Sequence, residues 1–95
     1  MTMKVNVLYV GKNGERLNFN DVKVGYFSRQ LIASNLDGVA LLRSSQITNF
    51  SIVSDNVLDL YGKPNAQGVS SIFRIFADSE QIAGLAQAVA REVYL

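Results

Sequence analysis

The sequence predicts one mainly-β (α+β) domain spanning residues 1–95, in which about seven short antiparallel strands form a partly open barrel or sandwich capped by one C-terminal amphipathic helix. Three observations lead to this fold class. Short apolar and β-branched runs fill the chain as far as residue 76, and turn residues separate them at near-regular intervals. Apolar residues take up helical spacing only after residue 78.

Turn residues divide the expected strands. Asn13-Gly14 is typical of a type I′ hairpin turn, in which both central residues need positive φ. Residues 35–38 and 54–56 form a second and a third turn, and 62–68 is a longer loop. We expect an irregularity near Thr48-Asn49. The apolar runs between these points cover residues 4–10, 16–19, 22–27, 30–33, 39–42, 47–52, 57–61 and 71–76.

A helix is predicted after residue 78. Asp78 and Gln81 form a variant capping box, and Glu80 adds negative charge to the first turn, where the helix dipole favours it. Gly84 lies inside the helix and costs about 1 kcal/mol relative to alanine, so it is either a tolerated flaw or a point of close backbone approach. One apolar stripe recurs at helical spacing: Ile82, Leu85, Ala86, Val89 and Val93.

The composition excludes several kinds of chemistry. The chain contains no Cys and no His, so it has no thiol nucleophile, no thiolate or imidazole metal site, and no Ser-His-Asp or Cys-His triad. We therefore predict no metal, no cofactor and no enzymatic activity.

The net charge and the hydropathy of the sequence indicate which partners and which cellular location to expect. A net charge of +1 gives no basic field to attract phosphate backbones, so we expect no nucleic-acid partner. The N-terminal apolar stretch is too short for a signal peptide, and no run reaches the roughly 18 apolar residues of a membrane span. We expect a cytoplasmic protein.

Residues Gly38 to Ile52 read Gly-Val-Ala-Leu-Leu-Arg-Ser-Ser-Gln-Ile-Thr-Asn-Phe-Ser-Ile. This stretch resembles the strand, connecting step and strand of bacterial pleckstrin-homology-like domains, and residues 26–33 resemble an earlier strand of that family. The runs at 58–61 and 72–76 and the helix from Ser79 follow in the family's order. The resemblance implies a non-enzymatic module that binds a protein and often self-assembles.

Two features depart from the lipid-binding members of the wider superfamily. Those members carry a Lys-x(n)-Lys/Arg-x-Arg motif at the first hairpin, whereas this chain has Lys12 and Arg16 with Glu15 between them. The tryptophan of the closing helix is also missing, because the chain contains no Trp. The resemblance therefore does not imply phosphoinositide recognition.

Lys12, Arg16 and Lys23 are the candidate ligand-binding residues. Together they would form a small cationic spot at the first hairpin that attracts an anionic headgroup, a small phosphate compound or an acidic partner. The alternative is a charged turn that keeps the hairpin soluble.

Asp55 and Asp59 are the nearest pair of carboxylates in the sequence. Paired carboxylates can divide acid and base roles when their environments differ. However, Asp55 is typical of a turn, and Asp59 alternates with apolar neighbours in a position to face Arg74 across the next hairpin. We therefore expect a cross-strand ion pair in place of a catalytic pair.

Phe73, Phe76, Tyr94 and Leu95 are the candidate partner-binding residues. Phe73 and Phe76 fall on opposite faces of one strand, so one face packs in the core and the other packs against the helix or another molecule. Tyr94 and Leu95 either anchor a partner or fold back over the barrel end, and the sequence favours neither alternative.

The sequence thus predicts a non-enzymatic protein–protein interaction or assembly module, whose partner is another protein or a second copy of itself. The expected contact is an exposed strand edge or the end of the helix. Three alternatives remain: an anionic lipid or phosphate ligand at the first hairpin, with peripheral membrane contact; a small phage or mobile-element inhibitor that binds a host complex; and an enzyme that uses carboxylates, Tyr or Lys.

Overall fold

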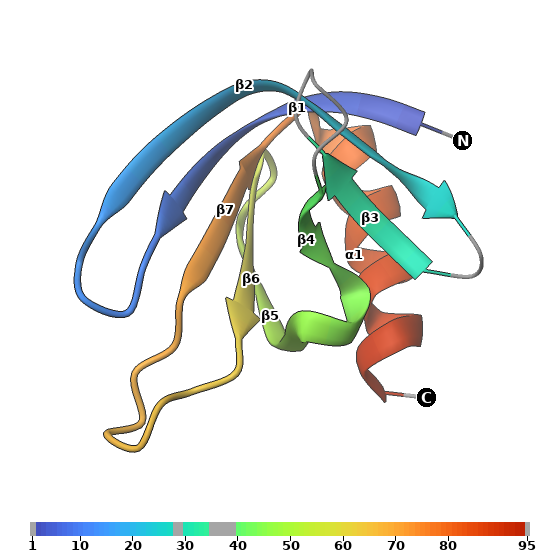
Figure 1. Ribbon diagram of the computed structural model, residues 1–95. Helices are drawn as coiled ribbons and strands as arrows, with labels where there is room; N and C mark the ends of the chain where they lie inside the picture. Colours follow the sequence, from blue (N-terminus) through green and yellow to red (C-terminus); the bar gives the residue numbers. More distant parts are fainter. Residues whose placement is uncertain (1, 28–29, 35–39, 95) are drawn as a thin grey trace.

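The computed structural model describes residues 2–27, 30–34 and 40–94 (Figure 1). The turn predicted at 35–38 and the candidate Leu95 lie outside the described residues. The elements in chain order are β1 (Thr2–Val10), β2 (Arg16–Phe27), β3 (Gln30–Ser34), β4 (Ala40–Arg43), the short 3-10 helix η1 (Ser44–Gln46), β5 (Ile47–Ser54), β6 (Val57–Gly62), β7 (Ile72–Phe76) and α1 (Ser79–Tyr94).

All strand pairs are antiparallel, and the seven strands form one sheet in the order β4-β3-β2-β1-β7-β6-β5. The first strand of the chain therefore lies in the middle of the sheet, where it joins two meanders. The sheet is open, and its two end strands, β4 and β5, are consecutive in the chain and linked by η1. This arrangement confirms the predicted mainly-β fold with a single C-terminal helix.

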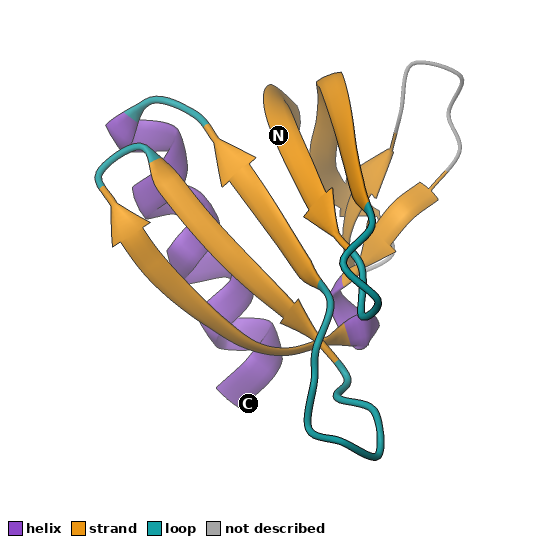
Figure 2. Ribbon diagram, turned by 90° about the vertical axis from the view of Figure 1, so that its left-hand side faces the viewer, coloured by secondary structure: helices purple, strands orange, loops and turns teal. Residues whose placement is uncertain are grey.

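The helix lies on the concave face of the bent sheet. It runs across β5, β6 and β7 in Figure 2, and it contacts β5, η1, β3 and β6. Every described member of the predicted helical stripe is buried, and Val89 is fully covered. Burying each side chain of this size contributes about 1.5–3 kcal/mol, so the contact between helix and sheet contributes substantially to stability. The sheet residues of the same core are Val5, Val7, Val22, Val24, Ala33, Ile47, Leu58, Leu60, Phe73 and Ile75.

The first hairpin turn differs from the prediction. Gly14 has a φ of 85°, but Asn13 is not among the residues with positive φ, so the predicted type I′ turn is wrong. Gly14 N–H donates to Gly11 O at 3.1 Å, and Gly11 N–H donates to Glu15 O at 2.8 Å. These bonds fit a type I turn closed by a glycine bulge, which needs only one residue with positive φ.

The strand β2 is continuous where the sequence suggested two runs. A bulge near Asp21 shifts the register between β1 and β2, and Asp21 adopts a φ of 55°. Its N–H faces Asn6 Oδ1 at 3.4 Å. Asp is one of the few residues that tolerates this left-handed conformation, so the polar residues between the two runs mark a bulge and not a turn.

Other local predictions are confirmed. The register of β5 shifts between Ile47 and Asn49, at the expected irregularity. At the start of α1, Gln81 N–H donates to Asp78 Oδ1 at 2.8 Å, and Asp78 N–H donates to Gln81 Oε1 at 3.2 Å, which completes the capping box. A Cβ added at Gly84 would meet nothing within 4 Å, so this glycine is a tolerated flaw and not a close approach.

Candidate functional site

The carboxylate of Asp59 is held in an ion pair with Arg74. The two residues are register partners on β6 and β7, and Arg74 Nε and NH2 donate to the two Asp59 oxygens at 2.7 and 2.8 Å. The Asp59 side chain is only 3% exposed, whereas that of Arg74 is 38% exposed. The hydrogen bond to this carboxylate, followed by its charge, raises the pKa of Arg74. The predicted ion pair is confirmed, and Asp55 lies apart from it in an exposed turn.

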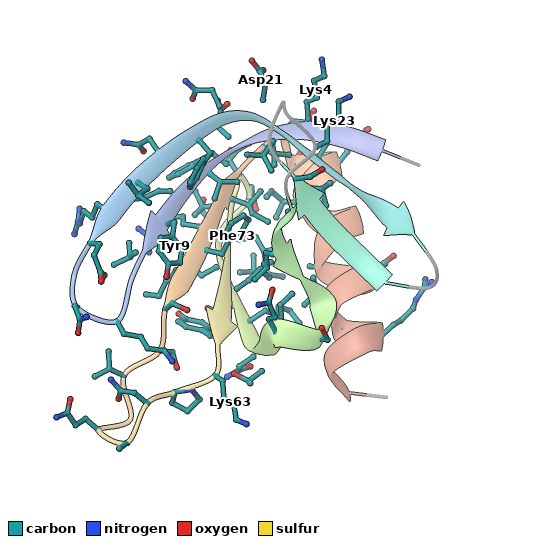
Figure 3. All side chains as sticks on the ribbon, viewed as in Figure 1. Lys4, Tyr9, Asp21, Lys23, Lys63 and Phe73 are labelled. Atoms are coloured by element: carbon teal, nitrogen blue, oxygen red, sulfur yellow. The ribbon has the colours of Figure 1, made fainter. Side chains whose placement is uncertain are left out.

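The structure does not bring the three candidate cations together. Lys12 lies exposed in the β1–β2 turn. Arg16 pairs with Val10, so alternation places it on the face opposite to Tyr9. Lys23 lies at the far end of β2, directly opposite Lys4, where Figure 3 shows these two lysines near Asp21.

A cavity of about 440 Å³ opens on the concave side of the sheet, and we call the region around it the mouth. It lies between the β1–β2 turn, the connection from β4 to β5, and the end of β6. The bonds of Thr48 Oγ1–H to Gly62 O (3.0 Å) and Gly62 N–H to Ser71 O (3.0 Å) join part of its wall. The lining residues are Tyr9, Lys12, Leu42, Ser45, Gln46, Thr48, Gly62, Lys63 and Ser71.

A second cavity of about 210 Å³ shares the lining residue Tyr9 with the first and is lined by Tyr9, Leu17, Phe19 and Phe73. Tyr9 pairs with Leu17 on one side and with Phe73 on the other, so these side chains share the concave face. Figure 3 shows Tyr9 and Phe73 next to each other. Phe73 is therefore a core residue that also contributes to a cavity wall, and it is only 4% exposed.

The mouth combines residues that the sequence analysis did not connect. Lys63 lies in the 62–68 loop, Ser71 follows that loop, and Lys12 belongs to the first turn. The end of β1 and the end of β6 lie near each other only because β7 pairs with both strands. This site could not be found from the sequence, because neither loop alone carries a binding motif and the strand order that brings the loops together was not known.

The strand β5 is the other exposed feature. It ends the sheet, and its sequence Ile-Thr-Asn-Phe-Ser-Ile-Val-Ser contains no charge and no proline. Ile52 and Val53 are 57% and 52% exposed. Phe76, at the same end of the neighbouring strands, is 40% exposed and lies on the opposite face of β7 from buried Phe73, as predicted.

The remaining candidates lie at the end of the helix. Tyr94 is the last residue of α1, and its side chain lies outside the described residues, as does all of Leu95. Both alternatives for this end therefore remain predictions.

Comparison with family models and with curated proteins found no match to this chain. Among the described residues, no helix has the length and apolar character that crossing a bilayer requires. The same residues contain no group of three or more His, Cys, Asp or Glu side chains suited to hold a metal ion.

Proposed function

We propose that this protein is a non-enzymatic, cytoplasmic interaction module that binds an extended segment of a protein partner along β5. The observation that carries the proposal is that the edge strand β5 is uncharged and has two consecutive, largely exposed apolar residues, Ile52 and Val53. The order of seven strands and a closing helix also supports placing the chain with pleckstrin-homology-like domains, as the resemblance implies.

An edge strand of a sheet has backbone N–H and C=O groups on one side that can pair with another chain. Among the strands that the structure describes, β5 pairs only with β6 and therefore forms one edge of the sheet. Natural edge strands usually carry lysine, proline or inward charge, which prevent unwanted pairing. An edge without these residues is suited to accept an added strand, whose backbone supplies hydrogen bonds and whose alternate side chains supply specificity.

The end of β5 is held in place, which favours binding. Asn56, in the turn after β5, donates from Nδ2 to Ala77 O at 3.0 Å, and Ala77 N–H donates to Asn56 O at 3.1 Å. These bonds tie the β5–β6 turn to the junction of β7 and α1. A partner strand would therefore meet an ordered edge, so less conformational entropy is lost on binding.

Selection from a displayed library of extended peptides tests the proposal. We expect peptides that bind the wild-type protein and lose about tenfold or more in affinity to Val53→Lys, because the added strand would bury an unpaired charge. Val69→Lys is the matched control, since Val69 is also exposed, at 43%, but lies outside β5. Peptides that bind both variants equally well would refute a site on β5.

A second copy of the chain is one partner that the same edge accepts. Light scattering over a wide concentration range distinguishes the cases. A dimer that Val53→Lys converts to a monomer identifies the protein itself as the partner. A strict monomer that binds peptides identifies a different protein.

A further inference from the structure

We infer that the concave mouth of the sheet binds a small free anionic amphiphile, in which an acid group carries a short alkyl chain or a single ring. This site is separate from β5, so the inference does not depend on the proposed function. It is carried by two cavities that share the lining residue Tyr9, the larger with a mixed polar and apolar lining and the smaller with a mainly apolar one.

The larger cavity suits the acid group. Lys12 and Lys63 line it together with the hydroxyl-bearing side chains of Ser45 and Ser71, whereas the hydroxyl hydrogen of Thr48 is donated to Gly62 O. None of its described lining residues is Asp or Glu. Ammonium and hydroxyl groups donate charge-assisted hydrogen bonds to carboxylate or phosphate oxygens.

The two lysines contribute from opposite sides of the mouth. Lys12 belongs to the β1–β2 turn, whereas Lys63 directly follows β6. Figure 3 shows Lys63 at the rim, extending into solvent. A lysine stem is long and flexible, so an ammonium at the rim can reach an acid group seated in the cavity.

The smaller cavity suits the apolar part. Its four lining residues, Tyr9, Leu17, Phe19 and Phe73, are apolar or aromatic. A dry protein cavity of about 150 Å³ binds benzene. The smaller cavity, at about 210 Å³, is therefore large enough for one ring or a short alkyl chain. The two volumes together lie within the range of small-molecule sites.

The arrangement along the concave face fixes the orientation of the ligand. Tyr9 lines both cavities, so a ligand that fills the smaller one extends past Tyr9 toward the lysines. A molecule with only one of the two parts would fill half of the site. The geometry thus favours an amphiphile over a simple anion and over a neutral hydrocarbon.

Titration of the ¹⁵N-labelled full chain with octanoate tests the inference by NMR. We expect chemical-shift changes at the amides of Tyr9, Thr48 and Phe73. Acetate lacks the alkyl chain and 1-octanol lacks the charge, so each should bind at least about tenfold more weakly, which corresponds to loss of one good contact. Equal affinity for octanoate and 1-octanol, or shift changes confined to β5, would overturn the inference.

Exposed lining residues provide variants that keep the fold. Lys12→Ala should weaken octanoate binding about tenfold and leave 1-octanol binding unchanged. Leu17→Gln should weaken both ligands, because Leu17 lines only the apolar cavity and is 53% exposed. Lys23→Ala is the control, since it removes the same charge at the far end of β2. A Lys12→Ala protein that binds octanoate normally would contradict the proposed site.

Two further measurements distinguish this site from the edge of β5 and from a membrane-binding surface. Val53→Lys should leave octanoate binding unchanged, so failure of the β5 proposal and failure of this one are distinguishable. Sedimentation with phosphatidylglycerol vesicles tests a lipid surface as the source of the acid group. Protein that sediments with vesicles but gives no shift changes with octanoate would refute a site for free ligands.

Discussion

Replacing Arg74 by methionine should destabilise the fold far more than loss of a surface ion pair. Arg74→Met keeps much of the alkyl stem but removes both hydrogen bonds to Asp59, whose side chain is 3% exposed. Breaking a buried pair by removing one partner costs about 3–5 kcal/mol. The Arg74 side chain is 38% exposed, so water reaches the vacated position and we expect the lower end, about 3 kcal/mol.

Urea unfolding measures this loss directly. A domain of this size has a total stability of about 5–14 kcal/mol, so the midpoint should fall markedly while the slope stays constant. The double variant Asp59→Leu with Arg74→Met should recover most of the loss, because no uncompensated charge remains buried. A single-variant loss under about 1 kcal/mol, or a double variant no more stable than Arg74→Met, would refute the reasoning.

The contribution of the Arg74 guanidinium should not change between neutral and mildly alkaline pH. The hydrogen bond to Asp59, followed by the charge of that carboxylate, raises the folded-state pKa of Arg74 above its usual value, so the guanidinium contributes its full stabilisation below that usual value. The contribution declines only as the pH rises through the folded-state pKa. The cost of Arg74→Met should therefore be the same at neutral and at mildly alkaline pH.

Substitutions at four further positions test the local structure, each by thermal unfolding. Gly84→Ala should stabilise the protein by about 1 kcal/mol and raise Tm by about 4–8 °C, because the added Cβ meets nothing within 4 Å; a lower Tm would contradict this. Gly14→Ala should instead destabilise by about 1–2 kcal/mol, since φ is 85° there, and an unchanged Tm would argue against the bulge. Asp78→Ala should cost about 1 kcal/mol through loss of the helix cap, whereas Asp78→Asn, which can still cap, should cost less. Leu58→Ala should cost about 2–5 kcal/mol, because Leu58 is fully buried, and a smaller loss would indicate a core that collapses around the cavity.

Local signals predicted the fold class well. Alternation along residues 57–61 separated Asp59 from its apolar neighbours and placed it opposite Arg74, because strand periodicity and a short hairpin fix the register. The capping residues of α1 were equally visible, since a capping box depends on residues only three apart.

The mouth was not predictable in the same way. Lys12 was identified, but it was grouped with Arg16 and Lys23, which the structure places on the other face and at the far end of β2. Its actual neighbour across the cavity, Lys63, is about fifty residues away in the chain. Sequence alternation assigns faces within one strand, whereas this site depends on which strands are neighbours.

The bulge at Asp21 shows a second limit. An Asn-Asp pair between two apolar runs is typical of a turn, and only the continued pairing of β1 with β2 distinguishes a bulge from a turn. The neighbouring strand supplies this information, and its residues are not adjacent to Asp21 in the sequence.

The central position of β1 has a consequence for synthesis on the ribosome. The strand β1 has one edge covered early, by β2, but its other edge waits for β7, which at residues 72–76 follows the other six strands in the chain. Until then one edge of β1 in the nascent chain stays unpaired, and the strands on the two sides of β1 cannot form one sheet. Completion of the fold must therefore wait until residues 72–76 have emerged, and chain breaks before residue 72 should leave β1 as an aggregation-prone edge.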